Sequence, residues 1–223
     1  RVLVAAGALT RWRPLLPRLE GGHAHVNTAV VTQEVVRVAV SDEDREALAS
    51  MPCIVCKFGT AQFGQATSFD SCYVLPPVEY AGVPFLKIGH GTWFERELPS
   101  LEAAVVWMRR QSEAGARGGI TAREALQGML ERILPGLLAR SPRIVTDRCM
   151  WDTTPTMRPY IDLLPGGQVG CCVGGNGFAA KSCDEIGRIA ALMMLAAVDG
   201  CGWSYDLPQE AFAATFETGA VDT

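Results

Sequence analysis

The chain has 223 residues, of which 48% are hydrophobic and 8% aromatic, and it carries a formal net charge of −4. This length and composition are those of a globular protein with a substantial core, in one large domain or two small ones. The charges are interspersed and slightly acidic, which argues against nucleic acid or an anionic membrane surface as the main partner.

The longest apolar stretch covers residues 189–198. As a helix it would span about 15 Å, roughly half of a bilayer core, so it predicts a buried helix and no membrane partner is expected. Neither end of the sequence shows a recognised targeting signal, and we expect an intracellular, cytoplasmic protein.

The eight cysteines do not show the spacing of a small disulfide-rich scaffold, which a chain of this size does not need. Cys53 and Cys56 form the one C-x-x-C pair. A structural zinc site needs four ligands, and neither a second such pair nor paired histidines accompany this one. Two free thiols in a strand, in a reducing compartment, are the simpler interpretation. A thiol or metal protein would instead show bound zinc in elemental analysis.

In chain order, the first predicted strand is an apolar run at residues 2–8, which is typical of a buried parallel strand. β-branched residues predict a second strand at 30–40, and a short apolar run predicts a third at 54–58. The polar, glycine-spaced residues 59–70 predict a loop.

Capping residues and apolar spacing predict three helices that pack against these strands, at residues 41–51, 99–112 and 121–135. Ser41 is expected to cap the first. The third opens with a capping box, Thr121-x-x-Glu124, in which each side chain accepts a hydrogen bond from the other residue's backbone amide. We assign no chemistry to these helices.

A strand pair follows the predicted loop, at residues 72–77 and 83–90, with a turn between them. Lys87 lies between Leu86 and Ile88, so in an alternating strand its side chain points away from both neighbours. From these residues alone, an ordinary exposed lysine opposite a buried face explains the pattern.

The most informative stretch lies near the C-terminus, where a short strand at 169–173 leads into a glycine-rich loop at 174–177 and then a helix. Ser182 and Glu185 have capping-box spacing at the helix start. Such a junction aims free amides and the positive end of a helix dipole at one spot, and glycines let a ligand approach. It predicts a site for a partly negative group, although many loops before helices are glycine-rich without binding anything.

The segments Cys149-Met150-Trp151, Ile161-Asp162 and Gly174-Gly-Asn-Gly-Phe178 resemble the C-terminal part of the FAD-dependent amine oxidases. These belong to the glutathione-reductase-like flavoproteins that include D-amino-acid oxidase, in the branch of monomeric sarcosine oxidase, pipecolate oxidase and N-methyltryptophan oxidase. The resemblance covers most of the chain loosely and its C-terminal part well.

The resemblance implies an α+β (α/β) fold in which a strand-rich substrate-binding domain is inserted in the C-terminal remainder of a glutathione-reductase-like FAD-binding domain. Residues 1–22 and 152–205 would form the partial FAD-binding domain. Residues 23–151 would form the substrate and catalytic domain. Apart from the resemblance, the thin apolar content of the last residues predicts a frayed tail at 206–223.

Cofactor-binding residues also follow from the resemblance. In that branch a Cys-Met-aromatic segment carries the flavin through its cysteine, so FAD is implied, possibly covalent through Cys149. The glycine loop lies against the pyrimidine edge of the flavin, and the glycine after the first strand comes near the cofactor. The corresponding residues here are Gly7, Gly174, Gly175, Asn176, Gly177 and Phe178. Relatives carry a lysine directly after the loop, whereas here two alanines intervene before Lys181.

The implied catalytic residues are Tyr73 and Lys87, which take the tyrosine and lysine positions of the family's substrate-domain hairpin, and Trp151, which would form part of a substrate cage. There the lysine lies under the flavin and promotes its reaction with oxygen. His90 follows Lys87 by three residues rather than the family's four, which turns it to the other face of the strand and argues against an active-site role.

The implied reaction is hydride transfer from a carbon next to the nitrogen of a small amine or amino acid to FAD, followed by reoxidation by molecular oxygen. The sequence contains no G-x-G-x-x-G dinucleotide-binding motif. We therefore expect an incomplete fragment or gene model in which residues 1–223 alone do not hold FAD. The alternative is a flavoprotein remnant or partner-binding module without catalysis.

Overall fold

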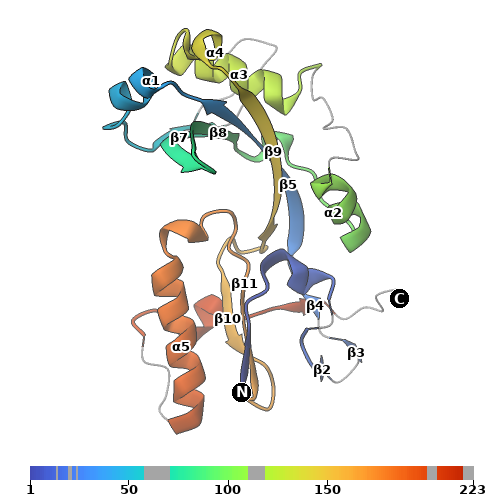
Figure 1. The fold of residues 1–223 in the computed structure, drawn as a ribbon. Helices are drawn as coiled ribbons and strands as arrows, with labels where there is room; N and C mark the ends of the chain where they lie inside the picture. The colour runs from blue at the N-terminus through green and yellow to red at the C-terminus, as the bar shows by residue number, and fades with distance from the viewer. Residues whose placement is uncertain are drawn as a thin grey trace. The chain divides into compact units, whose positions relative to one another are not determined.

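The computed structural model describes residues 1–13, 15–19, 22–23, 25–57, 71–109, 119–199 and 205–217. It mixes helices with mainly antiparallel sheets (Figure 1), which confirms the α+β part of the predicted fold. The chain divides into two compact units. Unit 1 contains Arg1–Val31, Glu97–Ala104 and Met150–Thr223, and unit 2 contains Thr32–Arg96 and Val105–Cys149.

The strands are β1 Val2–Val4, β2 Arg18–Leu19, β3 Gly22–His23, β4 His25–Val26, β5 Ala29–Ala39, β6 Ile54–Lys57, β7 Ser71–Tyr80, β8 Val83–His90, β9 Ile144–Thr153, β10 Tyr160–Leu163, β11 Val169–Val173 and β12 Phe216–Glu217. The α-helices are α1 Asp42–Ala47, α2 Leu101–Met108, α3 Ala122–Ile133, α4 Leu137–Arg140 and α5 Cys183–Asp199. Short 3₁₀ helices are η1 Gly7–Arg11, η2 Thr92–Phe94, η3 Ala179–Lys181 and η4 Gln209–Phe212. No helix of the described residues is long and apolar enough to cross a membrane.

A five-stranded sheet, in the order β6-β7-β8-β5-β9, forms the frame of unit 2. Alternate residues of its strands pack against α3 in one apolar core. This core contains Val36, Val38, Val74, Leu86, Ile88, Leu126, Met129 and Leu130. Because successive side chains of a strand point to opposite faces, the residues between these apolar positions lie on the face that α3 does not cover.

The hairpin β7–β8 differs from its predicted form. β7 continues to Tyr80, and the turn is the two-residue pair Ala81-Gly82, both with positive φ (49° and 80°) as in a tight hairpin turn. The sequence placed the turn earlier because Pro76 and Pro77 end most strands. Here the register shifts between Leu75 and Val78, so a bulge accommodates both prolines.

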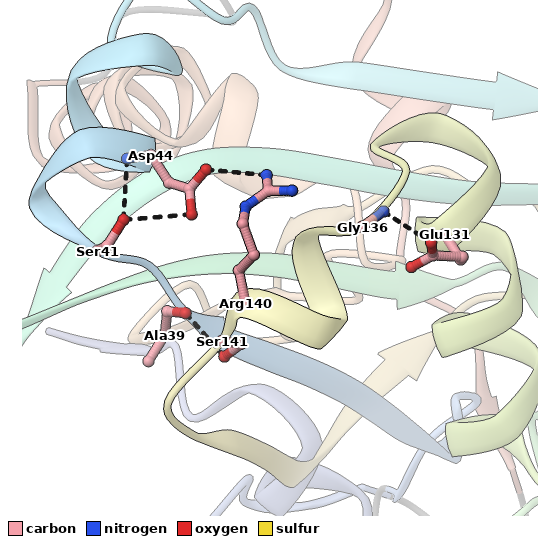
Figure 2. A network of polar contacts seen from close by, with 7 residues as sticks. All are labelled: Ala39, Ser41, Asp44, Glu131, Gly136, Arg140 and Ser141. Carbon is pink, nitrogen blue, oxygen red and sulfur yellow. Dashed lines mark hydrogen bonds and ion pairs between the residues drawn. The ribbon is translucent and has the colours of Figure 1, made fainter.

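Two short helices are tied to the end of β5 in unit 2 by polar contacts (Figure 2). Ser41 caps α1 by accepting a hydrogen bond from the Asp44 amide at 3.1 Å, which confirms the predicted cap. The Asp44 carboxylate pairs with Arg140 of α4 at 3.0 Å, and the Ser141 hydroxyl donates to the Ala39 carbonyl at 2.8 Å. These contacts join α1 to α4 and hold the end of α4 against the end of β5.

The frame of unit 1 is a three-stranded sheet in the order β1-β11-β10, with α5 packed on it (Figure 1). β1 runs parallel to β11, as predicted, but it ends at Val4 and is largely exposed, because it lies at the edge of this sheet. The apolar stretch of α5 is also not buried throughout: Ile189 and Met193 face the sheet, whereas Leu195 is exposed. Both predictions of full burial were therefore wrong.

The last described residues, 205–217, pack onto unit 1. Phe212 is buried in the core under α5, and β12 pairs with β4. The Asp162 carboxylate accepts a hydrogen bond from the Ala214 amide at 2.9 Å. Specific contacts therefore hold this range of the chain.

Candidate functional site

Unit 2 brings three predicted site residues together on the sheet face that α3 does not cover. Lys87 is half-buried, and its Nζ lies 6.0 Å from the centre of the Tyr73 ring. Cys149, on β9, lies close enough to influence Tyr73 electrostatically and to be influenced by Lys87. Lys87 thus points away from Leu86 and Ile88, as its alternation predicted.

Burial controls the protonation of these groups. It raises the pKa of the Tyr73 hydroxyl to about 12, and the neighbouring Cys149 and Tyr80 add to this shift. Cys149 is exposed as a residue, yet partial desolvation of its thiol raises its pKa, while the positive charge of Lys87 acts in the opposite direction. At neutral pH the Tyr73 hydroxyl is therefore a proton donor next to a fixed positive charge.

Gly89 makes room for Tyr73. The two residues are register partners on β8 and β7, and a Cβ atom at Gly89 would lie 2.4 Å from the Tyr73 ring. The ring therefore lies across the glycine, two positions from Lys87 on the same face. Sequence reasoning missed this contact because it depends on the register between two strands.

Arg37 is a further missed residue on this face. It is the register partner of Lys87 on β5, forms an ion pair with Asp147 of β9, and stacks 4.6 Å from the centre of the Tyr80 ring. Its position between the buried Val36 and Val38 is the same alternation that singled out Lys87, so the signal was present in the sequence. The face thus carries Lys87, the Arg37–Asp147 ion pair and, by the register of β6 with β7, Lys57.

In unit 1 the glycine loop between β11 and α5 is held by Asp152 at the end of β9. The buried Asp152 carboxylate accepts hydrogen bonds from the Gly174 amide at 2.8 Å and the Gly175 amide at 3.2 Å, and its carbonyl accepts one from the Asn176 amide at 3.0 Å. The expectation that these amides are free for a ligand was therefore wrong, because a carboxylate from the same chain already occupies them.

Asn176 adds further hydrogen bonds that hold the glycine loop in place. It adopts positive φ (52°) and is 2% exposed, its amide oxygen accepts from the Thr154 amide at 2.8 Å, and its amide nitrogen donates to the Gly174 carbonyl. The side chain thus fixes the loop internally. Gly174 itself requires glycine, since it has φ of +77° and a Cβ would lie 2.3 Å from Thr154.

The side chains that the loop presents outward are aromatic and basic. Phe178 is 56% exposed and lies 6.5 Å from Trp151, ring centre to ring centre, while Lys181 lies 5.5 Å from the Phe178 ring. A Cβ at Gly177 would lie 3.2 Å from the Trp151 ring, so the loop rests on that tryptophan. Trp151 therefore supports the loop directly, in addition to any role in a substrate cage.

The start of α5 differs from its prediction. Both Glu185 oxygens accept hydrogen bonds from Arg188 at 2.7 Å, and the Ser182 amide donates to the Ala179 carbonyl at 3.0 Å. The predicted capping box is therefore wrong. Asp184 and Glu185 also place negative charge in the first turn, which offsets the helix dipole and weakens this end as an anion site.

The remaining predicted residues lie apart from these two clusters. Gly7 opens η1 in unit 1 with φ of +53°. His90 is buried in unit 2, where its Nε2 accepts from the Glu34 amide at 3.1 Å and its Nδ1 contacts the Gly91 carbonyl. These contacts give His90 a structural role, in agreement with its predicted exclusion from the active site.

The C-x-x-C pair of the sequence is separated by the fold. Cys53 is exposed and precedes β6, whereas Cys56 lies within β6 opposite Cys72 of β7. In the parts of the chain that the structure describes, no three His, Cys, Asp or Glu side chains are placed to hold a metal ion.

No family model matches the chain, and no curated protein matches it significantly. Solved structures do match. A thermally stable mutant of fructosyl peptide oxidase has a TM-score of 0.57 at 12% identity, over 95% of this chain and 47% of that one. The fructosamine oxidase Amadoriase II from Aspergillus fumigatus has a TM-score of 0.53 at 18% identity, over 83% of this chain and 38% of that one.

NikD, described as an unusual amino acid oxidase essential for nikkomycin biosynthesis, has a TM-score of 0.51 at 18% identity, over 86% of this chain and 44% of that one. At these identities the likeness shows a shared fold. The chain spans less than half the length of each of these three oxidases.

Proposed function

We propose that this chain is the flavin-ring side of an FAD-dependent oxidoreductase that acts on the CH–NH bond of a small amine or amino acid. The observation that carries the proposal is the cluster of Lys87, Tyr73 and Cys149 on the face of the unit 2 sheet that α3 does not cover. The fold likeness to oxidases of fructosyl peptides, fructosamines and amino acids supports it, as does the resemblance of the Cys-Met-aromatic and glycine-loop segments.

The described residues fit the ring of a flavin better than its diphosphate. Lys87 and Tyr73 in unit 2 are a fixed cation and a half-buried aromatic hydroxyl, and Phe178 and Lys181 in unit 1 are an exposed ring and a cation. Each of these two pairs, taken by itself, would suit a flat aromatic ring that becomes negatively charged. For the diphosphate, by contrast, the sequence offers no G-x-G-x-x-G motif.

The flavin would supply the hydride-accepting chemistry, and the chain would orient it and set the charge around it. Lys87 would hold a positive charge where negative charge develops on oxygen, without reorganisation. Tyr73 would keep its hydroxyl protonated as a hydrogen-bond donor even at alkaline pH, because burial raises its pKa to about 12. Asp152 and Asn176 would keep the glycine loop in one conformation so that Phe178 and Lys181 are presented in fixed positions.

The proposed substrates are small secondary or primary amines, in the size range of sarcosine or pipecolate, and molecular oxygen is the proposed electron acceptor. In this organisation a strand-rich substrate domain, approximated by residues 23–151, interrupts the FAD-binding part at residues 1–22 and 152–205. The glycated amines named for two of the similar structures extend the candidate range to larger secondary amines.

Anaerobic rapid mixing of the FAD-loaded full-length protein tests the proposal. The panel contains sarcosine, pipecolate, a fructosyl amino acid and, as a control without nitrogen, glycolate. We expect a secondary amine to bleach the visible flavin absorbance, and oxygen to restore it with release of peroxide. Persistent flavin colour with every amine would contradict an oxidase and favour a non-catalytic flavoprotein. Failure to bind FAD would reject the cofactor.

Covalent attachment through Cys149 is a separate part of the proposal, since it needs only an accessible thiol near the flavin ring. After acid precipitation of the FAD-loaded protein, the yellow colour should stay in the pellet, and Cys149→Ser should release it to the supernatant. Cys183→Ser, which removes another exposed thiol, is the matched control and should retain the colour. Equal release from the unmodified protein and Cys149→Ser would contradict the covalent bond.

A further inference from the structure

Cys56 and Cys72 form a thiol pair that the sequence did not reveal. They are direct register partners on the antiparallel strands β6 and β7, and both side chains contribute to the core under α3. Cys72 is 2% exposed and Cys56 is half-buried, and Cys56 lies close enough to add to the burial that raises the pKa of the Cys72 thiol. Sixteen positions separate the two residues in the sequence, so only the strand register brings them together.

The geometry of such a pair suits a disulfide. Directly opposite residues of antiparallel strands have Cα atoms about 4.5–5.5 Å apart, which falls within the range of about 4.4–6.8 Å that disulfides span. β6 is the edge strand of its sheet and is bonded to β7 on one side. Small adjustments of β6 can therefore bring the two sulfur atoms together without displacing a central strand.

We propose that Cys56 and Cys72 are a peroxide-sensitive dithiol site that closes to a cross-strand disulfide. The Cys56 sulfur attacks one peroxide oxygen, so that an S–O bond forms, the O–O bond breaks and one water leaves. The Cys72 sulfur then attacks the Cys56 sulfur, an S–S bond forms, the S–O bond breaks and a second water leaves. The two thiols lose two electrons and both protons, and one hydrogen peroxide becomes two waters.

The environment of each thiol indicates which of the two reaction steps it takes part in as the attacking group. Burial, and the neighbouring Cys56, raise the pKa of Cys72 to about 12, so its thiol is rarely ionised and is the less reactive of the two toward peroxide. Cys56 is the more accessible of the two and therefore reacts with peroxide first. Since the thiolate is the reactive form, oxidation should accelerate as the pH rises.

Cys171 provides a matched comparison within the chain. It is 0% exposed, and burial, with the nearby Asp162, raises its pKa to about 12 as well. Its register partners, however, are Val4 and Asp162 rather than a cysteine. Cys171 therefore shares the burial and protonation of Cys72 and lacks an opposing thiol.

Peptide mapping after peroxide treatment tests the site. The protein is exposed to hydrogen peroxide, unfolded with excess N-ethylmaleimide, digested without reductant and analysed by mass spectrometry. We expect a Cys56–Cys72 linked peptide, lighter by two hydrogens than the two thiol peptides and separated by dithiothreitol, while Cys171 is fully alkylated. The link should form faster at higher pH and persist in Cys53→Ser, which removes the other thiol of the same peptide.

Alkylated Cys56 and Cys72 after peroxide, or a link from Cys72 to Cys53 in place of Cys56, would overturn the proposal. Linkage of Cys171 to the same extent would also overturn it, because reactivity would then not depend on an opposing thiol. The mapping needs no cysteine variant of the pair itself, so a folding defect does not obscure the result. Peroxide is added directly, and the outcome is therefore independent of whether the chain takes part in a flavin oxidase.

Discussion

Gly89 determines where the Tyr73 ring lies in the candidate site. The Tyr73 ring lies across β8 because Gly89 has no side chain, and this places the ring beside Lys87. Any larger residue at position 89 would have to push the ring away, since a Cβ would lie 2.4 Å from it.

We expect Gly89→Ala to lower the free energy of unfolding by about 1–3 kcal/mol, the usual cost of overpacking. Gly128→Ala is the matched control: its Cβ would meet no atom within 4 Å on α3, so a gain of about 0.5–1 kcal/mol is expected. Urea titrations measure both. In a Tyr73→Ala background the cost of Gly89→Ala should largely vanish, and an unchanged cost would show that the Tyr73 ring is not the group displaced.

For single residues, the sequence predicts to which face of a strand a side chain points, because this direction follows from the alternation of apolar and polar residues. The direction of Lys87 followed from its apolar neighbours Leu86 and Ile88, and the same rule would have found Arg37. Asp152 could not be recognised in this way, because its role depends on a loop 22 residues away that folds back onto it.

The helix starts show how one sequence pattern gives two structures. Thr121 and Glu124 form a complete capping box at α3, as predicted. Ser182 and Glu185 have the same spacing, but Arg188 binds the Glu185 carboxylate, and η3 precedes the helix directly, so that the Ser182 amide already donates to Ala179. A competing cation and a preceding helical turn are not part of the capping pattern.

Thr121→Ala should therefore lower the free energy of unfolding by about 1 kcal/mol, since it removes the side-chain acceptor for the Glu124 amide. Ser182→Ala should have a clearly smaller effect, although sequence pattern alone predicts equal effects for the two changes. Chemical denaturation followed by circular dichroism compares them. Equal losses would contradict the distinction between the two helix starts.

The ends of the strands and their neighbours in the sheet were harder to predict from the sequence. The strand and turn residues of the β7–β8 hairpin were recognisable, but the two prolines suggested an end where the chain instead forms a bulge. The position of β1 at a sheet edge was not recognisable either, because an apolar run does not reveal how many neighbours a strand has.

For the whole molecule, buried thiols predict a loss of stability at alkaline pH. Burial raises the pKa of Cys72 and Cys171 from an ordinary 9.0 to about 12. Above the ordinary value the unfolded chain releases these protons while the folded chain retains them. The stabilising contribution of these protonated thiols is thus fully present below about pH 9 and is lost as the pH rises toward 12, on the order of 1 kcal/mol per pH unit for each group.

Urea denaturation across this range measures the slope. Cys171→Ala should make the profile shallower by one group, and Cys183→Ala, at an exposed position, should leave it unchanged. Identical slopes for Cys171→Ala and the unmodified protein would show that the Cys171 thiol is not protected from ionisation.

We propose that Lys87, on the face of the unit 2 sheet that α3 does not cover, lies where a reduced flavin reacts with oxygen. The direct measurement is the reoxidation rate of the amine-reduced flavin after rapid mixing with oxygen, in Lys87→Met and in Lys57→Met. Lys57 is an exposed lysine on β6, the edge strand of the same sheet, so Lys57→Met removes one positive charge from this sheet, as Lys87→Met does. We predict that Lys87→Met slows reoxidation roughly 100-fold, about 2.7 kcal/mol of transition-state stabilisation, with flavin reduction by the amine retained and Lys57→Met unchanged. Equal reoxidation rates in the two variants and the unmodified protein would contradict the claim.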